Sequence, residues 1–110
     1  MPSDIDHAKF ADDLRRRVAE SGVADAALRR AALRAGAGEE VDEGTSHGLL
    51  ARTIGEASYR VTDEMVADVR AATGSDKAAF EVVMSAGIGA GLRRWDAALA
   101  AIRDADDATR

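Results

Sequence analysis

The chain of 110 residues contains no cysteine. This absence excludes disulfide bonds, thiolate metal sites and any thiol-based redox cycle carried out by this chain alone. Long hydrophobic runs are also missing: no 18 consecutive apolar residues occur, and the first ten residues form neither a basic region nor an apolar stretch. We therefore expect no membrane span, no export signal and a cytoplasmic location.

A surplus of positive charge is missing as well. The net charge is -5, the sequence pI is about 4.9, and basic residues are interleaved with acidic ones. Binding to nucleic acid depends on a broad basic surface that releases counterions. We therefore expect no nucleic-acid partner.

Large apolar side chains are few. Of the 51 hydrophobic residues, 25 are alanine, and Leu, Ile, Val and Phe together number 21. Alanine-rich helices pack closely but bury little apolar area each, so a single chain has a thin core. We expect a homo-oligomer, or a hetero-oligomer with a related helical subunit, that buries more surface.

The remaining pattern predicts one all-α domain of about five helices over residues 1–110. Apolar residues recur at helical spacing, glycines and capping residues separate the segments, and no repeat or hairpin signal is present. The acidic stretch at 39–46 has no periodicity and predicts a surface loop. The expected helices cover roughly 4–21, about Ala24 to Ala35, a segment capped by Ser46, a segment between Thr62 and Gly74, and a long segment after Ser75.

Helix starts and faces can be assigned from the same residues. Ser3 and Asp6 resemble a capping box for the first helix, and Thr62 and Ser75 are capping residues for the last two. In the second helix we expect Leu28, Ala32 and Leu33 to point inward and Arg29, Arg30 and Arg34 to point outward. In the first helix the expected inward residues are Phe10, Leu14 and Val18.

The long last segment contains three glycines, Gly87, Gly89 and Gly91, in a region of helical periodicity. Glycine in a helix interior costs about 1 kcal/mol relative to alanine, so a close contact with a neighbouring helix must offset it. We expect Gly87 and Gly91, with Ala86 and Ala90 beside them, to form this interface, either within the subunit or between subunits. The inward series is expected to be Phe80, Val83, Met84, Gly87, Ile88, Gly91, Leu92, Trp95, Leu99 and Ile102, with 103–110 as a frayed acidic tail.

Nucleotide or phosphate binding at the glycines and calcium binding at the acidic loop are both disfavoured. A dinucleotide-binding glycine motif needs a preceding strand and a different glycine spacing, and a phosphate loop needs a terminal Gly-Lys-Ser or Gly-Lys-Thr. The carboxylates of Glu39, Glu40, Asp42 and Glu43 lack the ligand pattern of a calcium loop. We therefore expect no metal and no cofactor.

Four residues are candidates for a chemical role. His47 is the best-placed titratable group for general acid-base catalysis, but the favoured alternative is an exposed histidine in a first helical turn. Arg93 and Arg94, next to Trp95, could line a pocket for an anionic ligand. The structural alternative pairs these arginines with carboxylates and places Trp95 in the core.

Residues 49–102 resemble the later part of the alkylhydroperoxidase D-like and carboxymuconolactone decarboxylase superfamily. The resemblance rests on the "VTDEMVADVRAA" element, the Ser-Asp turn, and a long helix in which Arg94, Asp96, Ala98 and Leu99 occupy comparable places. It implies an all-α subunit that assembles into rings, often through a long helix rich in glycine and alanine. The two cysteines of the peroxidase branch are absent, so its redox centre cannot be carried over.

Three functions follow as hypotheses. The first is a non-redox helical subunit that acts by self-assembly or with a paralogous partner. The second is a cofactor-independent decarboxylase or isomerase that uses His47 as acid or base and an arginine to hold a substrate carboxylate. The third is a small-molecule binding module with a cleft beside Trp95.

Overall fold

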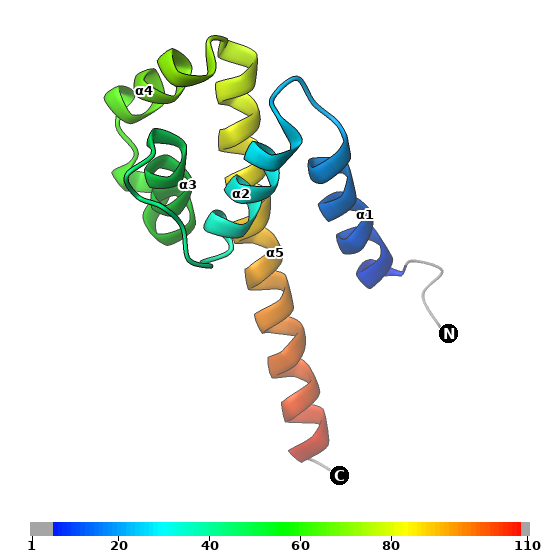
Figure 1. The fold of residues 1–110 in the computed structure, drawn as a ribbon. Helices are drawn as coiled ribbons and strands as arrows, with labels where there is room; N and C mark the ends of the chain where they lie inside the picture. The colour runs from blue at the N-terminus through cyan, green and yellow to red at the C-terminus, as the bar shows by residue number, and fades with distance from the viewer. Residues whose placement is uncertain (1–5, 109–110) are drawn as a thin grey trace.

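The protein is all-α, as a computed structural model of the chain describes it for residues 6–108 (Figure 1). Those residues form helices and no strand, and α5 continues through residues 103–108, where a frayed tail was expected. The prediction of an all-α fold with a long C-terminal helix is confirmed. In chain order the elements are α1 (His7–Glu20), α2 (Ala26–Gly36), α3 (Ser46–Ala57), the 3-10 turn η1 (Ser58–Arg60), α4 (Asp63–Thr73) and α5 (Asp76–Ala108).

Capping residues set the helix boundaries as their side-chain chemistry requires. The side chain of Thr62 accepts a hydrogen bond from the amide of Met65 at 3.2 Å, and that of Ser75 accepts one from Ala78 at 3.0 Å. Gly74 ends α4 with φ +78°, a left-handed conformation that favours glycine. The first turn of α3 is capped by Thr45 rather than Ser46. Asp6 caps α1, whereas the predicted contribution of Ser3 lies outside the described residues.

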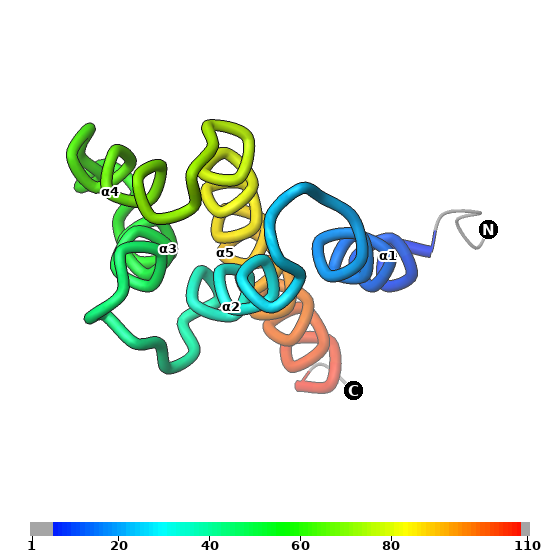
Figure 2. The backbone as a smooth tube through the Cα atoms, turned by 45° about the horizontal axis from the view of Figure 1, so that its top comes forward, coloured from blue at the N-terminus to red at the C-terminus, as the bar shows by residue number. Residues whose placement is uncertain are grey.

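Helix α5 runs through the middle of the molecule (Figures 1 and 2). One end of it lies between α1 on one side and α3 and α4 on the other, with α2 packed alongside. Its second half projects away from the other helices, and the molecule measures 54 × 26 × 20 Å. We call residues 92–108 the stalk and the remainder the head. Within residues 6–108, no helix is both long and apolar enough to cross a membrane.

The core of the head consists mainly of small side chains. Leu50, Val69 and Val82 are the largest side chains that are fully buried. Because alanine and glycine have almost no side chain, helices built from them approach each other closely but bury little apolar area. The core cluster consists of Ala32, Ala35, Leu50, Ala51, Val69, Ala79, Val82 and Ala86.

Three glycines sit where α2, α3 and α5 meet, and we call them the glycine junction. A Cβ atom on Gly36 would collide with the backbone carbonyl of Ala86 in α5. A Cβ on Gly89 would collide with the carbonyl of Leu33 in α2, and one on Gly55 with the carbonyl of Gly36. The helix backbones are thus in direct contact at this point, and only glycine fits there.

Arg29 corrects one prediction, since it points inward and is only 4% exposed. Its guanidinium donates hydrogen bonds to the carbonyls of Val18 at 2.7 Å and Ala19 at 3.1 Å, and a further one to Ala24. The carbonyls at the end of a helix have no partners within it, and Arg29 supplies them for α1. A buried charge is tolerated here because its donors are paired.

Glu81 of α5 fixes the same α1–α2 connection from the other side. Its carboxylate accepts hydrogen bonds from the amides of Val23 at 2.6 Å and Ala24 at 2.5 Å. Partial burial raises the pKa of Glu81, but these two hydrogen bonds and the charge of Arg29 outweigh it and lower the pKa overall. The pKa of Glu81 is lower in the folded chain than in the unfolded chain, so its ionised carboxylate stabilises the fold. This contribution is fully present above the unfolded pKa and is lost as the pH falls through the folded pKa.

Candidate functional site

Helix α5 has two opposite apolar faces. Successive helical residues are rotated by about 100°, so residues two positions apart point in nearly opposite directions. Val82, Ala86 and Gly89 are buried against the head. Met84, Ile88 and Gly91, each two positions further along, therefore lie on the other side. A helix that is apolar on opposite sides is normally covered on both.

The second face is exposed in this chain. We define this apolar face as Phe80, Met84, Gly87, Ile88, Gly91, Trp95 and Ile102. Four of its side chains are large and open to solvent, with exposed fractions of 61% for Phe80, 46% for Met84, 37% for Trp95 and 66% for Ile102. The prediction that Phe80, Met84, Trp95 and Ile102 point inward is therefore wrong within the chain, whereas Val83 of the same predicted series packs against the core. The core uses the face of small residues instead, because close helix approach buries more backbone there.

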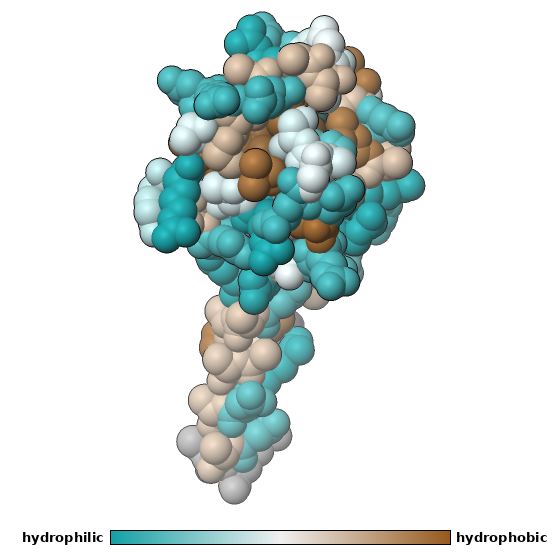
Figure 3. Space-filling view, turned by 60° about the vertical axis from the view of Figure 1, so that its left-hand side comes forward, coloured by the Kyte–Doolittle hydropathy of each residue, from teal (hydrophilic) through white to brown (hydrophobic). Residues whose placement is uncertain are grey.

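Within the head, the apolar face continues into grooves on both sides. A groove of about 460 Å³ separates it from α3 and α4 and is lined mainly by Ile54, Val61, Val66 and Val83. A smaller one of about 190 Å³ lies toward α1, next to Leu14 and Val18. Figure 3 shows apolar side chains in several patches of the head, among hydrophilic ones, and pale, weakly apolar side chains along the stalk. The two grooves thus extend the face toward α1 on one side and toward α3 and α4 on the other.

The stalk is joined to the head near its beginning, where Arg93 lies against Gly38 at the end of α2 and Arg94 donates a hydrogen bond to the carbonyl of Gly55 in α3. Helix α1 adds two further links. Arg15 and Asp96 form an ion pair at 2.8 Å, and the rings of His7 and Trp95 lie 5.7 Å apart, tilted by 57°. Both links are at the solvent-exposed edge, and surface ion pairs contribute at most about 1 kcal/mol. Beyond Asp96, every described residue except Leu99 is exposed.

The glycines and alanines predicted as an interface fall into two groups. Ala86 and Ala90 are buried within the chain, with exposed fractions of 0% and 4%, and Ala86 belongs to the α2 contact. A Cβ on Gly87 or Gly91 would have nothing within 4 Å. The glycine that allows the close helix contact within the subunit is therefore Gly89, and Gly87 and Gly91 remain open on the apolar face.

The other predicted site residues point in different directions. Arg93 lines a cleft between α2 and α5, Arg94 donates a long hydrogen bond of 3.5 Å to the carbonyl of Gly55, and Trp95 lies beside His7. His47 lies in the first turn of α3, with Nε2 3.5 Å from Oγ1 of Thr45, and is not among the residues lining the Arg93 cleft. The structure does not bring these residues together.

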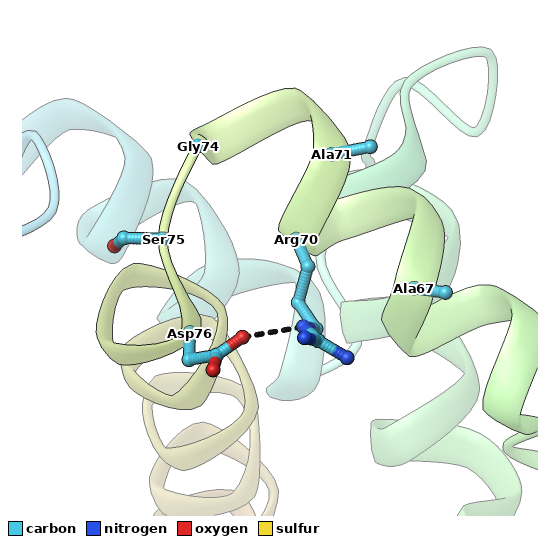
Figure 4. Close-up of a pocket in the computed structure, with 6 residues that line it drawn as sticks. All are labelled: Ala67, Arg70, Ala71, Gly74, Ser75 and Asp76. Carbon is cyan, nitrogen blue, oxygen red and sulfur yellow. Dashed lines mark ion pairs between the residues drawn. The ribbon is translucent and has the colours of Figure 1, made fainter.

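Another hollow lies at the α4–α5 corner (Figure 4). It has a volume of about 540 Å³ and is lined by Ala67, Arg70, Ala71, Gly74, Ser75 and Asp76. Its one cation is already neutralised, since Nε of Arg70 lies 2.5 Å from Oδ1 of Asp76. The hollow is shallow and holds no unpaired charged group that could bind or activate a substrate.

No clustered metal ligands are found in the part of the chain that the structure describes. There, no group of three or more His, Asp or Glu side chains lies close enough to hold an ion. In the acidic loop, Asp42 accepts a hydrogen bond from the amide of Gly44 at 2.8 Å, and Glu43 pairs with Arg52 at 3.2 Å. These carboxylates are thus engaged within the chain.

Compared with protein-family models, with curated proteins and with solved structures, the chain has no significant match. The class of protein is therefore defined by the fold and the surface alone. It is a small all-α protein whose longest helix has one apolar face packed in the head and a second apolar face exposed.

Proposed function

We propose that this protein is a self-associating helical subunit, in which the apolar face of α5 binds the same face of a second copy. The observation that carries this proposal is the pair of opposite apolar faces on α5, of which the chain covers one. Contiguous apolar surface of this extent on a helix is typical of an interaction site. The same face on both partners gives a closed two-fold dimer.

The size of the exposed surface supports this proposal. A compact monomer of 11.5 kDa exposes about 5,800 Å², whereas this chain exposes 7272 Å². Its radius of gyration is 15.9 Å, compared with about 13 Å for a compact domain of this length. The excess of about 1,500 Å² exceeds the roughly 800 Å² that each partner buries in a standard interface.

The charges at the two ends of the apolar face favour an antiparallel pair. Lys77 lies at its beginning and Asp106 at its end, both on the same side of α5 as Met84 and Ile102 by helical spacing. Each charge lies at the end of the helix dipole that disfavours it. An antiparallel copy places Lys77 of one chain near Asp106 of the other, whereas a parallel copy places like charges together.

The sizes of the side chains are complementary in the same arrangement. If two copies of α5 cross at Gly91, Gly87 of one chain lies opposite Trp95 of the other. Phe80 of one chain then lies opposite Ile102 of the other. The crossing at Gly91 allows the two backbones to approach closely, because glycine has no side chain. Each stalk would lie along the grooves of the partner's head.

The test is the mass of the protein in solution. We expect light scattering to give about twice the 11.5 kDa chain mass for the native protein and the chain mass for the double variant Trp95→Glu, Ile102→Glu. Both side chains are exposed in the single chain, so the helical content by circular dichroism should be unchanged. Burying the new carboxylates in the interface would be strongly unfavourable.

A matched control introduces the same two charges elsewhere on the stalk. Ala97 and Ala100 are exposed and lie on the side of α5 away from the apolar face, so Ala97→Glu, Ala100→Glu should keep the double mass. Self-association through this face is ruled out if the native protein has the mass of one chain at tens of micromolar. It is equally ruled out if both double variants dissociate alike.

Self-association does not require membership of the alkylhydroperoxidase D-like and carboxymuconolactone decarboxylase superfamily, which stays a prediction from the residues quoted above. A paralogous partner in place of a second copy also stays a prediction, and it would appear as a native chain that is monomeric alone. The decarboxylase or isomerase alternative would need His47 and an arginine in one site. The Arg93 cleft contains no such pair.

A further inference from the structure

A cleft of about 400 Å³ lies between α2 and the start of the stalk, on the side of α5 away from the apolar face. Its walls are apolar: Leu33 comes from α2, Ala37 from the C-cap of α2, and Gly89 and Leu92 from α5. Small-molecule sites in proteins have volumes of about 300–1,000 Å³, apolar walls and a few placed polar groups. The shape and the walls of this cleft fit that description.

The rim of the cleft carries two unpaired cations. Arg34 and Arg93 line it, and neither side chain has an ion pair or hydrogen bond within residues 6–108. Arg15, also at the rim, is neutralised by Asp96 at 2.8 Å. With Glu39 as the other charged lining residue, the cleft has a net positive charge in a chain whose net charge is -5.

The guanidinium of Arg93 lies beside the end of α2. Gly38 has φ +89°, and a Cβ atom there would lie 2.5 Å from Nη1 and 3.0 Å from Cζ of Arg93. The left-handed conformation and the missing side chain of Gly38 therefore leave the space that the guanidinium occupies. A cation at the carboxyl end of a helix is also favoured by the helix dipole. The guanidinium of Arg93 thus lies against the end of α2 without being neutralised.

We propose that this cleft binds a small carboxylate with an apolar body. A carboxylate can accept two hydrogen bonds from the planar guanidinium of an arginine, and two arginines at one rim strengthen that preference. The apolar body would lie against Leu33 and Leu92. Because the cleft and the apolar face lie on opposite sides of α5, this inference and the proposed self-association can fail independently.

The test uses 4-phenylbutyrate as the probe, with 4-phenylbutanol as a neutral control of nearly the same shape. At low ionic strength we expect the native protein to bind the carboxylate with a dissociation constant in the millimolar range or tighter. Binding should shift the backbone amide NMR signals of Ala37 and Gly89. Arg34→Gln and Arg93→Gln should each weaken it at least tenfold.

Arg60→Gln is the matched control, because Arg60 is exposed on η1 and does not line the cleft. It should bind the probe as the native protein does, and each variant should keep the native dispersion of its NMR spectrum. Equal binding of the alcohol, or unchanged binding by the two cleft variants, would overturn the inference. Inorganic phosphate that binds as tightly as 4-phenylbutyrate would also overturn it, since a bare anion gains nothing from the apolar walls.

Discussion

Replacing Gly36 by alanine is expected to lower the free energy of unfolding by about 3 kcal/mol or more. The new Cβ would collide with the backbone carbonyl of Ala86, so α2 and α5 would have to separate at the glycine junction. A backbone carbonyl cannot rotate away as a flexible side chain can, and α2 has its most extensive contacts with α5. Urea denaturation followed by circular dichroism measures the loss.

The matched control is Gly87→Ala, the same substitution on α5 where a Cβ has nothing within 4 Å. In dilute protein, where copies are dissociated, alanine should raise the stability by about 1 kcal/mol because it favours the helix. Equal effects of the two substitutions would contradict the close contact between the backbones of α2 and α5.

Replacing Arg29 by methionine is expected to cost about 3 kcal/mol. Methionine is similar in length but donates no hydrogen bonds, so the carbonyls of Val18, Ala19 and Ala24 would lose their partner. Chemical denaturation measures the change. Amide hydrogen exchange should also become faster in the last turn of α1, because that turn would open more often.

Arg30→Met is the control for this prediction, because Arg30 is the next residue of α2 and its side chain is exposed. A change within about 0.5 kcal/mol is expected there. If the two methionine variants were equally stable, the inward position of Arg29 would be wrong.

Local sequence signals were sufficient to locate the helices. Thr62, Gly74 and Ser75 set boundaries through contacts with their own neighbours in the chain, and such contacts can be recognised without knowledge of the tertiary structure. The order of the five helices follows from these boundaries and the 3.6-residue periodicity, whereas the continuation of α5 through residues 103–108 was not predicted.

The direction in which α5 faces could not be predicted in the same way. The prediction assumed that the largest apolar side chains, such as Phe80 and Met84, point to the core. In the structure the face with Ala86 and Gly89 is buried, because backbone contact with α2 requires small residues. Both faces satisfy the same periodicity, so only the position of α2 distinguishes them.

The candidate sites depended even more on tertiary structure. Arg29 lies between two other arginines in the sequence of α2, and nothing local shows that it meets the carbonyls that end α1. Arg93 was identified as a ligand-binding candidate together with Arg94 and Trp95. Consecutive helical residues point in different directions, so only Arg93 faces the cleft with Arg34.

Cross-linking through introduced cysteines tests the pairing of α5 most directly, because the native chain has none to interfere. Phe80→Cys and Ile102→Cys proteins are oxidised separately and as a mixture, and the products are separated by electrophoresis without reductant. The antiparallel pair predicts a disulfide-linked dimer from the mixture and little from either protein alone. Efficient linking of each variant to itself would show parallel helices, and no linking in any sample would contradict pairing through this face.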